Sequence, residues 1–192
     1  MPVPRCENRT KSALDLALRK LLEEKPLDQI RVREVAELCA IRRQSFYYHF
    51  PDVYALFDWS LRQEQSALLI RQEACLTWQQ ALTDLLNRTA QNRSYYQSLL
   101  YRGTRGSLRE LLEPVLKPML TQTMQYYQLR CGIQPEDRAS TLACWETLLL
   151  TLLESWIQDG SRQTQEILSA LDALIRQGTI GAAWQNLPAQ PR

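Results

Sequence analysis

The sequence predicts an all-α protein. Among its 192 residues there are 33 leucines but only 5 valines and 8 isoleucines. Leucine loses little rotamer freedom in a helix, whereas β-branched residues favour strands. Glycine is scarce, with six in all and the first at Gly103. Apolar residues also recur at helical spacing along most of the chain, which favours helices packed on one another.

Four helices are expected in the N-terminal part. Pro26 ends the first of them because proline cannot continue a helix. Val35 and Leu38 are expected to face inward from the second, which a short connection containing Ala40 joins to the third. Asp52 is a good N-cap for the fourth. These helices are expected over residues 10–24, 32–38, 42–50 and 53–70.

Longer helices are expected in the remainder. Pro114 and Pro118 cannot donate a helix hydrogen bond, so the helix that contains them should be kinked or split. Gly132 follows the end of that helix, and Gly160 separates the last two. The expected ranges are 78–100, 108–130, 134–158 and 163–177.

Charge and composition exclude several functions. The net charge is only +2, from 23 basic and 21 acidic residues, so any contact with nucleic acid must be local. The single histidine, His49, excludes zinc sites built on several histidines and leaves one candidate for histidine-based catalysis. We therefore expect no enzyme, no cofactor and no metal.

The chain is expected to lie in the cytoplasm. Residues 1–5 contain no apolar signal-peptide region, and the longest apolar run, 148–153, is far too short to span a membrane. The five cysteines have no C-x-x-C spacing, which favours a reducing compartment. No membrane partner is expected.

A helix-turn-helix is expected within LDQIRVREVAELCAIRRQSFYYHFPDVYAL, residues 27–56. Phe46 and Phe50 lie four residues apart and therefore share one face of the third helix. We expect them to pack on Leu18, Leu22, Val35 and Leu38. The remaining side chains of this helix suit the major groove and the phosphates of DNA. They are Arg43, Gln44, Ser45, Tyr47, Tyr48 and His49.

The segments Val32–Leu38 and Arg43–Phe50, at this spacing, resemble the N-terminal domain of the TetR (tetracycline-repressor-like) family of bacterial transcriptional regulators. The resemblance implies a homodimer that binds double-stranded DNA. It also implies two roles in the interface. Residues that read bases would be Arg43, Gln44 and Tyr47, and those that hold the DNA backbone would be Arg33, Tyr48 and His49.

Three positions depart from the family pattern. Ala40 stands where a glycine is usual, and would strain the turn by roughly 1–2 kcal/mol if it needs a positive φ. Arg31 and Arg42 replace the usual Ser or Thr N-caps, and Val53 replaces a lysine. Our hypothesis is that Arg31 and Arg42 give up helix stability and supply the phosphate contacts that Val53 cannot make.

Each assignment in the DNA-binding helix has an alternative. Arg43 and Gln44 could be ordinary solvated positions, and the two tyrosines could be half-buried core. His49 could hold its helix by a hydrogen bond to the backbone.

Two apolar rows suggest the dimer interface. The apolar residues of the 134–158 helix are spaced alternately three and four residues apart, which is typical of helix pairing. This helix and the last helix, contributed by each of two chains, would form a four-helix bundle. The alternative is that either row faces only its own core. The expected interface is Leu142, Trp145, Leu149, Leu152, Trp156, Leu168, Leu171 and Ile175.

An effector site is expected between residues 75 and 135. Large aromatic and sulfur-containing side chains there could form its walls, although ordinary core is at least as good an interpretation. No group of charges identifies the effector, which could be a small molecule or a protein. The candidates are Trp78, Tyr95, Tyr96, Tyr101, Met119, Met124 and Tyr127.

These features predict a DNA-binding domain over residues 1–52 and a helical effector-binding and dimerisation domain over 53–192. The expected function is a repressor that binds a palindromic operator as a homodimer and is released by an effector. The alternative is an interaction protein of the same fold that acts through a protein partner, with weak or no DNA binding of its own.

Overall fold

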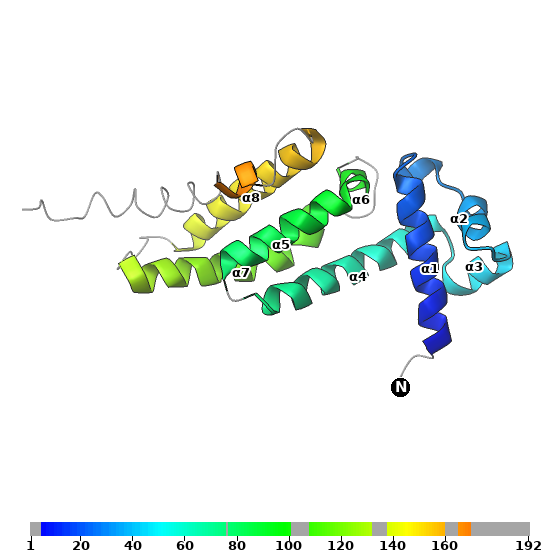
Figure 1. The fold of residues 1–192 in the computed structure, drawn as a ribbon, viewed down its shortest axis with the longest axis horizontal. Helices are drawn as coiled ribbons and strands as arrows, with labels where there is room; N and C mark the ends of the chain where they lie inside the picture. The colour runs from blue at the N-terminus through cyan, green and yellow to red at the C-terminus, as the bar shows by residue number, and fades with distance from the viewer. Residues whose placement is uncertain (1–4, 76, 101–107, 132–137, 160–164, 170–192) are drawn as a thin grey trace, which may run out of the picture. The chain divides into compact units, whose positions relative to one another are not determined.

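The computed structural model describes residues 5–75, 77–100, 108–131, 138–159 and 165–169. These residues form helices and contain no strand, which confirms the all-α prediction (Figure 1). None of the described helices is long and apolar enough to cross a membrane. The helices are α1 (Arg5–Leu22), η1 (Leu27–Gln29), α2 (Val32–Leu38), α3 (Arg43–His49), α4 (Val53–Glu73), α5 (Trp78–Gln91), α6 (Arg93–Ser98), α7 (Leu108–Cys131) and α8 (Arg138–Asp159).

The chain forms two compact units. The first unit contains residues 1–67 and 92–111, and the second contains 68–91 and 112–192. The first therefore includes the predicted 1–52 domain together with most of α4 and all of α6. Helix α6 belongs with the helix-turn-helix although the sequence places it between α5 and α7.

The first unit is built around α1. This helix packs against α2 and α6, and α2 packs against α3. Leu14 and Leu18 of α1 are fully buried, as are Val35 of α2 and Phe46 of α3. The spacing of these residues places one apolar side of each helix in a shared core, and burying each side chain stabilises the unit by about 1.5–3 kcal/mol.

Leu38 does not join this core. The prediction that it faces inward is wrong, because its side chain is 47% exposed. The buried side of α2 is formed by Val35 and Ala36, with Val32 and Cys39 half-buried one turn away on the same side. At 3.6 residues per turn, position 38 lies beside that row rather than on it.

The connection between α2 and α3 has the strained backbone that its sequence suggested. Ala40 has a φ of 53°, in the left-handed region where a Cβ is unfavourable. The turn is held by hydrogen bonds from the N–H of Ala40 to the carbonyl of Glu37 (3.1 Å) and from that of Ile41 to Ala36 (3.0 Å). These bonds reverse the chain within three residues and position α3.

A single helix over 78–100 was predicted, and the structure corrects this. The chain leaves the helix at Asn92, whose φ of −118° and ψ of 33° are not helical, and resumes as the short α6. Asparagine competes with the helix through local hydrogen bonding, and neither glycine nor proline marks the break.

Helix α7, in contrast, continues through both of its prolines. Pro114 lacks the N–H that would donate to the carbonyl of Glu110. In the first unit, Nε2 of Gln65 donates to that carbonyl instead (3.0 Å), and also reaches the carbonyl of Leu111 (3.3 Å). A side chain of α4 thus compensates for a bond that proline removes.

Candidate nucleic-acid interface

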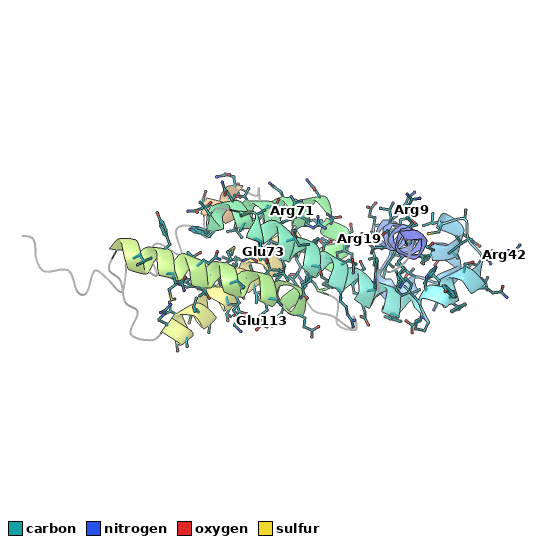
Figure 2. The ribbon with its side chains drawn as sticks, turned by 90° about the horizontal axis from the view of Figure 1, so that it is seen from below. Arg9, Arg19, Arg42, Arg71, Glu73 and Glu113 are labelled. Atoms are coloured by element: carbon teal, nitrogen blue, oxygen red, sulfur yellow. The ribbon has the colours of Figure 1, made fainter. Side chains whose placement is uncertain are left out.

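Helix α3 has one buried side and one polar side. Phe46 is fully buried and Phe50, just after the helix, is nearly so, with their ring centroids 6.2 Å apart. Tyr47 and Tyr48 are 55% and 79% exposed. The exposed residues at the start of the helix are Arg42, Arg43, Gln44 and Ser45. Figure 2 shows Arg42 extending away from α1.

Aromatic packing orients the two tyrosines. The Tyr47 ring meets the buried Phe46 ring edge-on, with centroids 5.8 Å apart. Tyr48 lies edge-on to His49 at 5.0 Å. His49 is half-buried, and its Nδ1 is shielded with no hydrogen-bond partner among the described residues. The backbone hydrogen bond considered as an alternative for His49 is therefore not made through Nδ1.

The start of α2 is stabilised by an acid in place of a capping side chain. The Arg31 N–H donates to Oε2 of Glu34 (2.9 Å). The Arg31 guanidinium has no acceptor, so it cannot cap the helix amides in return. Lys25 also pairs with Glu34, and its hydrogen bond is the main cause that lowers the pKa of that carboxyl. Arg31 itself is exposed.

Two further polar side chains make local contacts. Arg33 is exposed and pairs with Glu37 one turn later (2.5 Å), so a phosphate would compete with that carboxylate. Asp52 caps α4 as predicted, since its Oδ1 accepts from the N–H of Ala55 (2.7 Å). Val53 is buried and belongs to the core.

The local charge of this surface differs from that of the chain. Between residues 31 and 50 there are four arginines and two glutamates, while the whole chain carries only +2. Arginine suits phosphates and guanine edges because its guanidinium donates in a planar fork. Among the described residues, no group of three or more His, Cys, Asp or Glu could hold a metal ion.

The predicted effector residues that the structure describes belong to both units. Trp78, Met119 and Met124 are buried in the second unit, and the indole Nε1 of Trp78 has no hydrogen-bond partner among the described residues. Tyr95 and Tyr96 belong to the first unit. Tyr101 and the side chain of Tyr127 lie outside the part of the chain that the structure describes.

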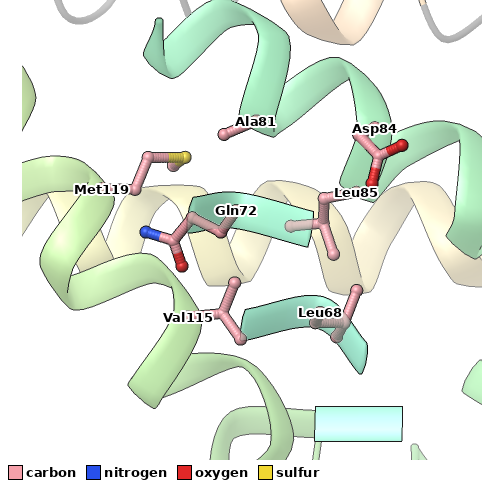
Figure 3. Close-up of a pocket in the computed structure, with 7 residues that line it drawn as sticks. All are labelled: Leu68, Gln72, Ala81, Asp84, Leu85, Val115 and Met119. Carbon is pink, nitrogen blue, oxygen red and sulfur yellow. The ribbon is translucent and has the colours of Figure 1, made fainter. Parts of the chain in front are cut away.

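A small cavity lies in the second unit between α4, α5 and α7, and Met119 is the predicted effector residue that lines it. Its volume is about 10 Å³, enough for one water molecule. The Gln72 amide lies between Met119 and Val115 (Figure 3), and its Oε1 is buried without a hydrogen-bond partner among the described residues. The other lining residues are Leu68, Ala81, Asp84 and Leu85.

The predicted dimer residues divide between the core and the surface. Trp145, Leu149 and Trp156 are covered by their own chain. Leu142, Leu152 and Leu168 are half-buried, and Leu148, between them in α8, is 48% exposed. Leu171 and Ile175 lie outside the described residues.

Sequence reasoning missed one buried polar cluster in the first unit. Arg19 and Glu64 form an ion pair there, with Tyr95 and Tyr96 beside it. Because the two charges are 45 residues apart, no local pattern could have brought them together. Both tyrosines were predicted as walls of an effector site.

A helix-turn-helix whose second helix exposes Arg, Gln, Ser and Tyr defines a DNA-binding protein. A family model of bacterial regulatory proteins, tetR family, matches residues 15–58. A second model, of a transcriptional regulator C-terminal region of TetR proteins, matches residues 76–177, which is more than half of the chain. The chain belongs to the TetR family of transcriptional regulators.

Three relatives are informative. The dhaKLM operon transcriptional activator DhaS of Lactococcus lactis is 27% identical over 90 residues, 47% of this chain and 48% of DhaS, so the match spans about half of that protein. A solved structure of DhaS aligns with a TM-score of 0.57 at 17% identity, covering 92% of this chain and 95% of DhaS.

A tetR-family regulator from Streptomyces coelicolor aligns with a TM-score of 0.71 at 16% identity, covering 97% of this chain and 85% of that one. RolR, solved in complex with resorcinol, aligns with a TM-score of 0.58 at 19% identity, covering 96% and 98%. At these identities the alignments show a shared fold alone.

Proposed function

We propose that the protein binds a palindromic operator as a homodimer through α3. The observation that carries this is the exposure of Arg43, Gln44 and Tyr47 on a helix whose opposite side is fixed in the core by Phe46. Arginine can bond O6 and N7 of guanine, and glutamine N6 and N7 of adenine, so the start of α3 would read bases. Ser45 would assist there, and Arg33, Tyr48 and His49 would contact phosphates, with Arg31 and Arg42.

A gel-shift titration with the DNA upstream of the protein's own gene tests this proposal. We expect a shifted band, protection of an inverted repeat, and affinity that falls steeply with salt, by about 0.9 logarithmic units per phosphate contact for each tenfold rise in salt. Arg43→Ala should weaken binding, while Arg62→Ala, an exposed arginine of α4, should not. Absence of any shift at low salt with neighbouring promoters would overturn the proposal and favour an interaction protein.

The proposed effect on transcription is repression. DhaS is named as an activator, which is the specific reason to consider activation as the second candidate. A reporter gene under the bound promoter distinguishes the two. Repression predicts more transcription when the gene for this protein is deleted, and activation predicts less.

Two copies are proposed to pair through α8 and the segment after it. Leu142, Leu148 and Leu152 are the leucines of α8 that their own chain leaves partly uncovered. A dimer also gives one short helix the affinity it lacks alone, by placing two of them about 34–36 Å apart. Sedimentation should show a dimer that Leu148→Glu dissociates, whereas Gln158→Glu, at an exposed position, leaves it intact. A dimer that survives Leu148→Glu unchanged would contradict this interface.

We propose that a small molecule acting as effector enters the second unit at the Gln72 cavity. The buried Oε1 of Gln72 can accept a hydrogen bond, so the ligand would carry a hydroxyl or amine on an apolar body. RolR, whose structure contains resorcinol, has the same fold. The cavity must open, because its volume of about 10 Å³ has room for only one water molecule.

Thermal-shift screening with small phenols and alcohols tests this site. A stabilising compound should lose its effect with Gln72→Leu and keep it with Gln79→Leu, an exposed position on α5. A hit that is indifferent to Gln72 would place the site elsewhere.

A further inference from the structure

The first unit contains an ionic cluster that the DNA-contacting surface does not use. The Glu64 side chain in α4 is completely buried, yet it is an ion-pair partner. One of its oxygens accepts from Nη2 of Arg19 in α1 (3.0 Å), and the other accepts from the hydroxyl of Tyr96 in α6 (2.9 Å). Three helices therefore meet at one carboxylate.

Arg19 makes further contacts with the same three helices. Its Nε donates to Oδ2 of Asp15 in α1 (3.1 Å), and its Nη2 also reaches the hydroxyl of Ser60 in α4 (3.3 Å). Its guanidinium lies over the ring of Tyr95 in α6, with 4.0 Å between Cζ and the ring centroid. Ser60 in turn donates to the hydroxyl of Tyr95 (3.1 Å). Burial raises the pKa of Tyr95, so this phenol stays neutral.

Such a cluster is better suited to fixing a geometry than to adding stability. Moving two charges out of water costs nearly what their pairing returns, so apolar side chains of the same volume would hold the helices as tightly. The hydrogen bonds, however, are satisfied in one arrangement only, since a shift of any helix leaves a buried charge without its partners. Helix α6 has only six residues and cannot be stable alone, so tertiary contacts, these among them, hold it in place.

The position of α1 determines that of α3, because α1 packs on α2 and α2 packs on α3. Helix α6 packs on the same α1, and in sequence it follows α5 of the second unit directly, at Asn92. We propose that Arg19, Glu64, Tyr95 and Tyr96 are positioning residues that fix α1, and with it α2 and α3, relative to α6. DNA binding would then depend on where α6 is held. The effect on DNA rests on the proposed function.

The test uses Tyr96→Phe, which removes one hydroxyl and no volume elsewhere, in the full-length protein. We expect specific DNA affinity to fall about five- to twentyfold, the size of a typical coupling between sites. The dependence on salt should be unchanged, because no phosphate contact is removed. Glu64→Gln should weaken binding by a similar factor, and the double variant by little more than either alone.

Thr89→Val is the matched control. Thr89 is buried in α5 and donates to the carbonyl of Leu85 in its own helix (2.8 Å), so its loss also removes a buried hydroxyl bond. It should lower the melting temperature and leave DNA affinity unchanged. If Tyr96→Phe and Thr89→Val weaken DNA binding equally for the same loss of melting temperature, the network is merely structural and the proposal is overturned.

Amide hydrogen exchange of the free protein separates this proposal from the proposed function. Tyr96→Phe should speed amide exchange in α1, α2 and α3 by at least severalfold, whereas Thr89→Val should leave the exchange rates in those helices unchanged. This outcome supports the positioning role even if the wild-type protein shifts no DNA, in which case only the proposed function fails. Unchanged exchange in α1–α3 of the Tyr96→Phe variant contradicts the positioning role.

Discussion

Helix α3 of the first unit and the Gln72 cavity of the second show opposite relations between polar groups and the core. In α3, the polar side chains are exposed, and the buried Phe46 beneath them holds the helix in place. In the cavity, a polar atom, Oε1 of Gln72, is buried without a partner among the described residues. A surface that is already formed suits a large rigid partner such as DNA, whereas an unsatisfied buried acceptor suits a small ligand.

The largest expected effect separates the core of α3 from its surface. Phe46→Ala should lower the free energy of unfolding by about 3–5 kcal/mol, because it leaves a cavity beneath the recognition helix. Tyr48→Ala should change it by less than about 0.5 kcal/mol and still weaken DNA binding. Urea unfolding measures the first effect and a gel shift the second. Equal losses of stability would mean that Tyr48 belongs to the core.

The next effect tests whether the two arginines at the helix starts exchange stability for DNA contacts. Replacing Arg31 by Thr and Arg42 by Ser should stabilise the protein by about 0.5–2 kcal/mol per cap, since neither arginine caps its helix with its side chain. The double variant should also bind DNA less tightly, with a salt dependence smaller by about two phosphate contacts. Thermal unfolding and salt-titrated gel shifts provide the two readouts. Unchanged operator affinity would make the hypothesis wrong.

A smaller gain is expected at the turn between α2 and α3. Ala40→Gly relieves a left-handed alanine, which costs about 1–2 kcal/mol, but gives the unfolded chain more freedom. The net stabilisation should be about 0.5–1 kcal/mol by urea unfolding. Ala74→Gly, near the end of α4, is the control and should show no such gain. A destabilised Ala40→Gly protein would contradict the strain assigned to this turn.

The smallest effect concerns acid. Arg71 donates to Asp84 in the second unit, and this hydrogen bond is the main cause that lowers the pKa of the Asp84 carboxyl. The stabilisation is therefore complete above the unfolded-state pKa, about 3.9, and is lost as the pH falls through the lower folded value. Asp84→Asn should cost under about 1 kcal/mol at pH 7 and nothing near pH 2. Urea unfolding at the two pH values would contradict this if the difference persisted in acid.

The contrast between the two regions also explains what the sequence could predict. The bounds of α2 and the N-cap at Asp52 follow from local patterns, and the structure confirms both. The strain at Ala40 was expected from the resemblance, on the condition of a positive φ, and the φ of 53° meets that condition. The side chains of α3 were predicted as an exposed set because Phe46 and Phe50 identify its buried side. The local sequence was sufficient to predict those features that a single short segment determines.

The remaining features depend on residues far apart in the sequence. The break at Asn92 has no proline or glycine to mark it, and Leu38 was placed inward on too short a helix to define a face. Tyr95 and Tyr96 were predicted as pocket walls, yet they surround an ion pair made by α1 and α4. Only the folded chain brings Arg19 and Glu64 together, so no spacing rule could assign the tyrosines their place.

The proposal on which the others depend is that the exposed start of α3 reads DNA sequence. Its most direct test is fluorescence anisotropy with the protected inverted repeat and a scrambled duplex of the same length, using the wild type and Arg43→Ala/Gln44→Ala. We expect the double variant to lose most of the preference for the inverted repeat, about 1–3 kcal/mol per base-reading residue, and to keep much of its binding to scrambled DNA. An unchanged ratio of the two affinities would contradict it.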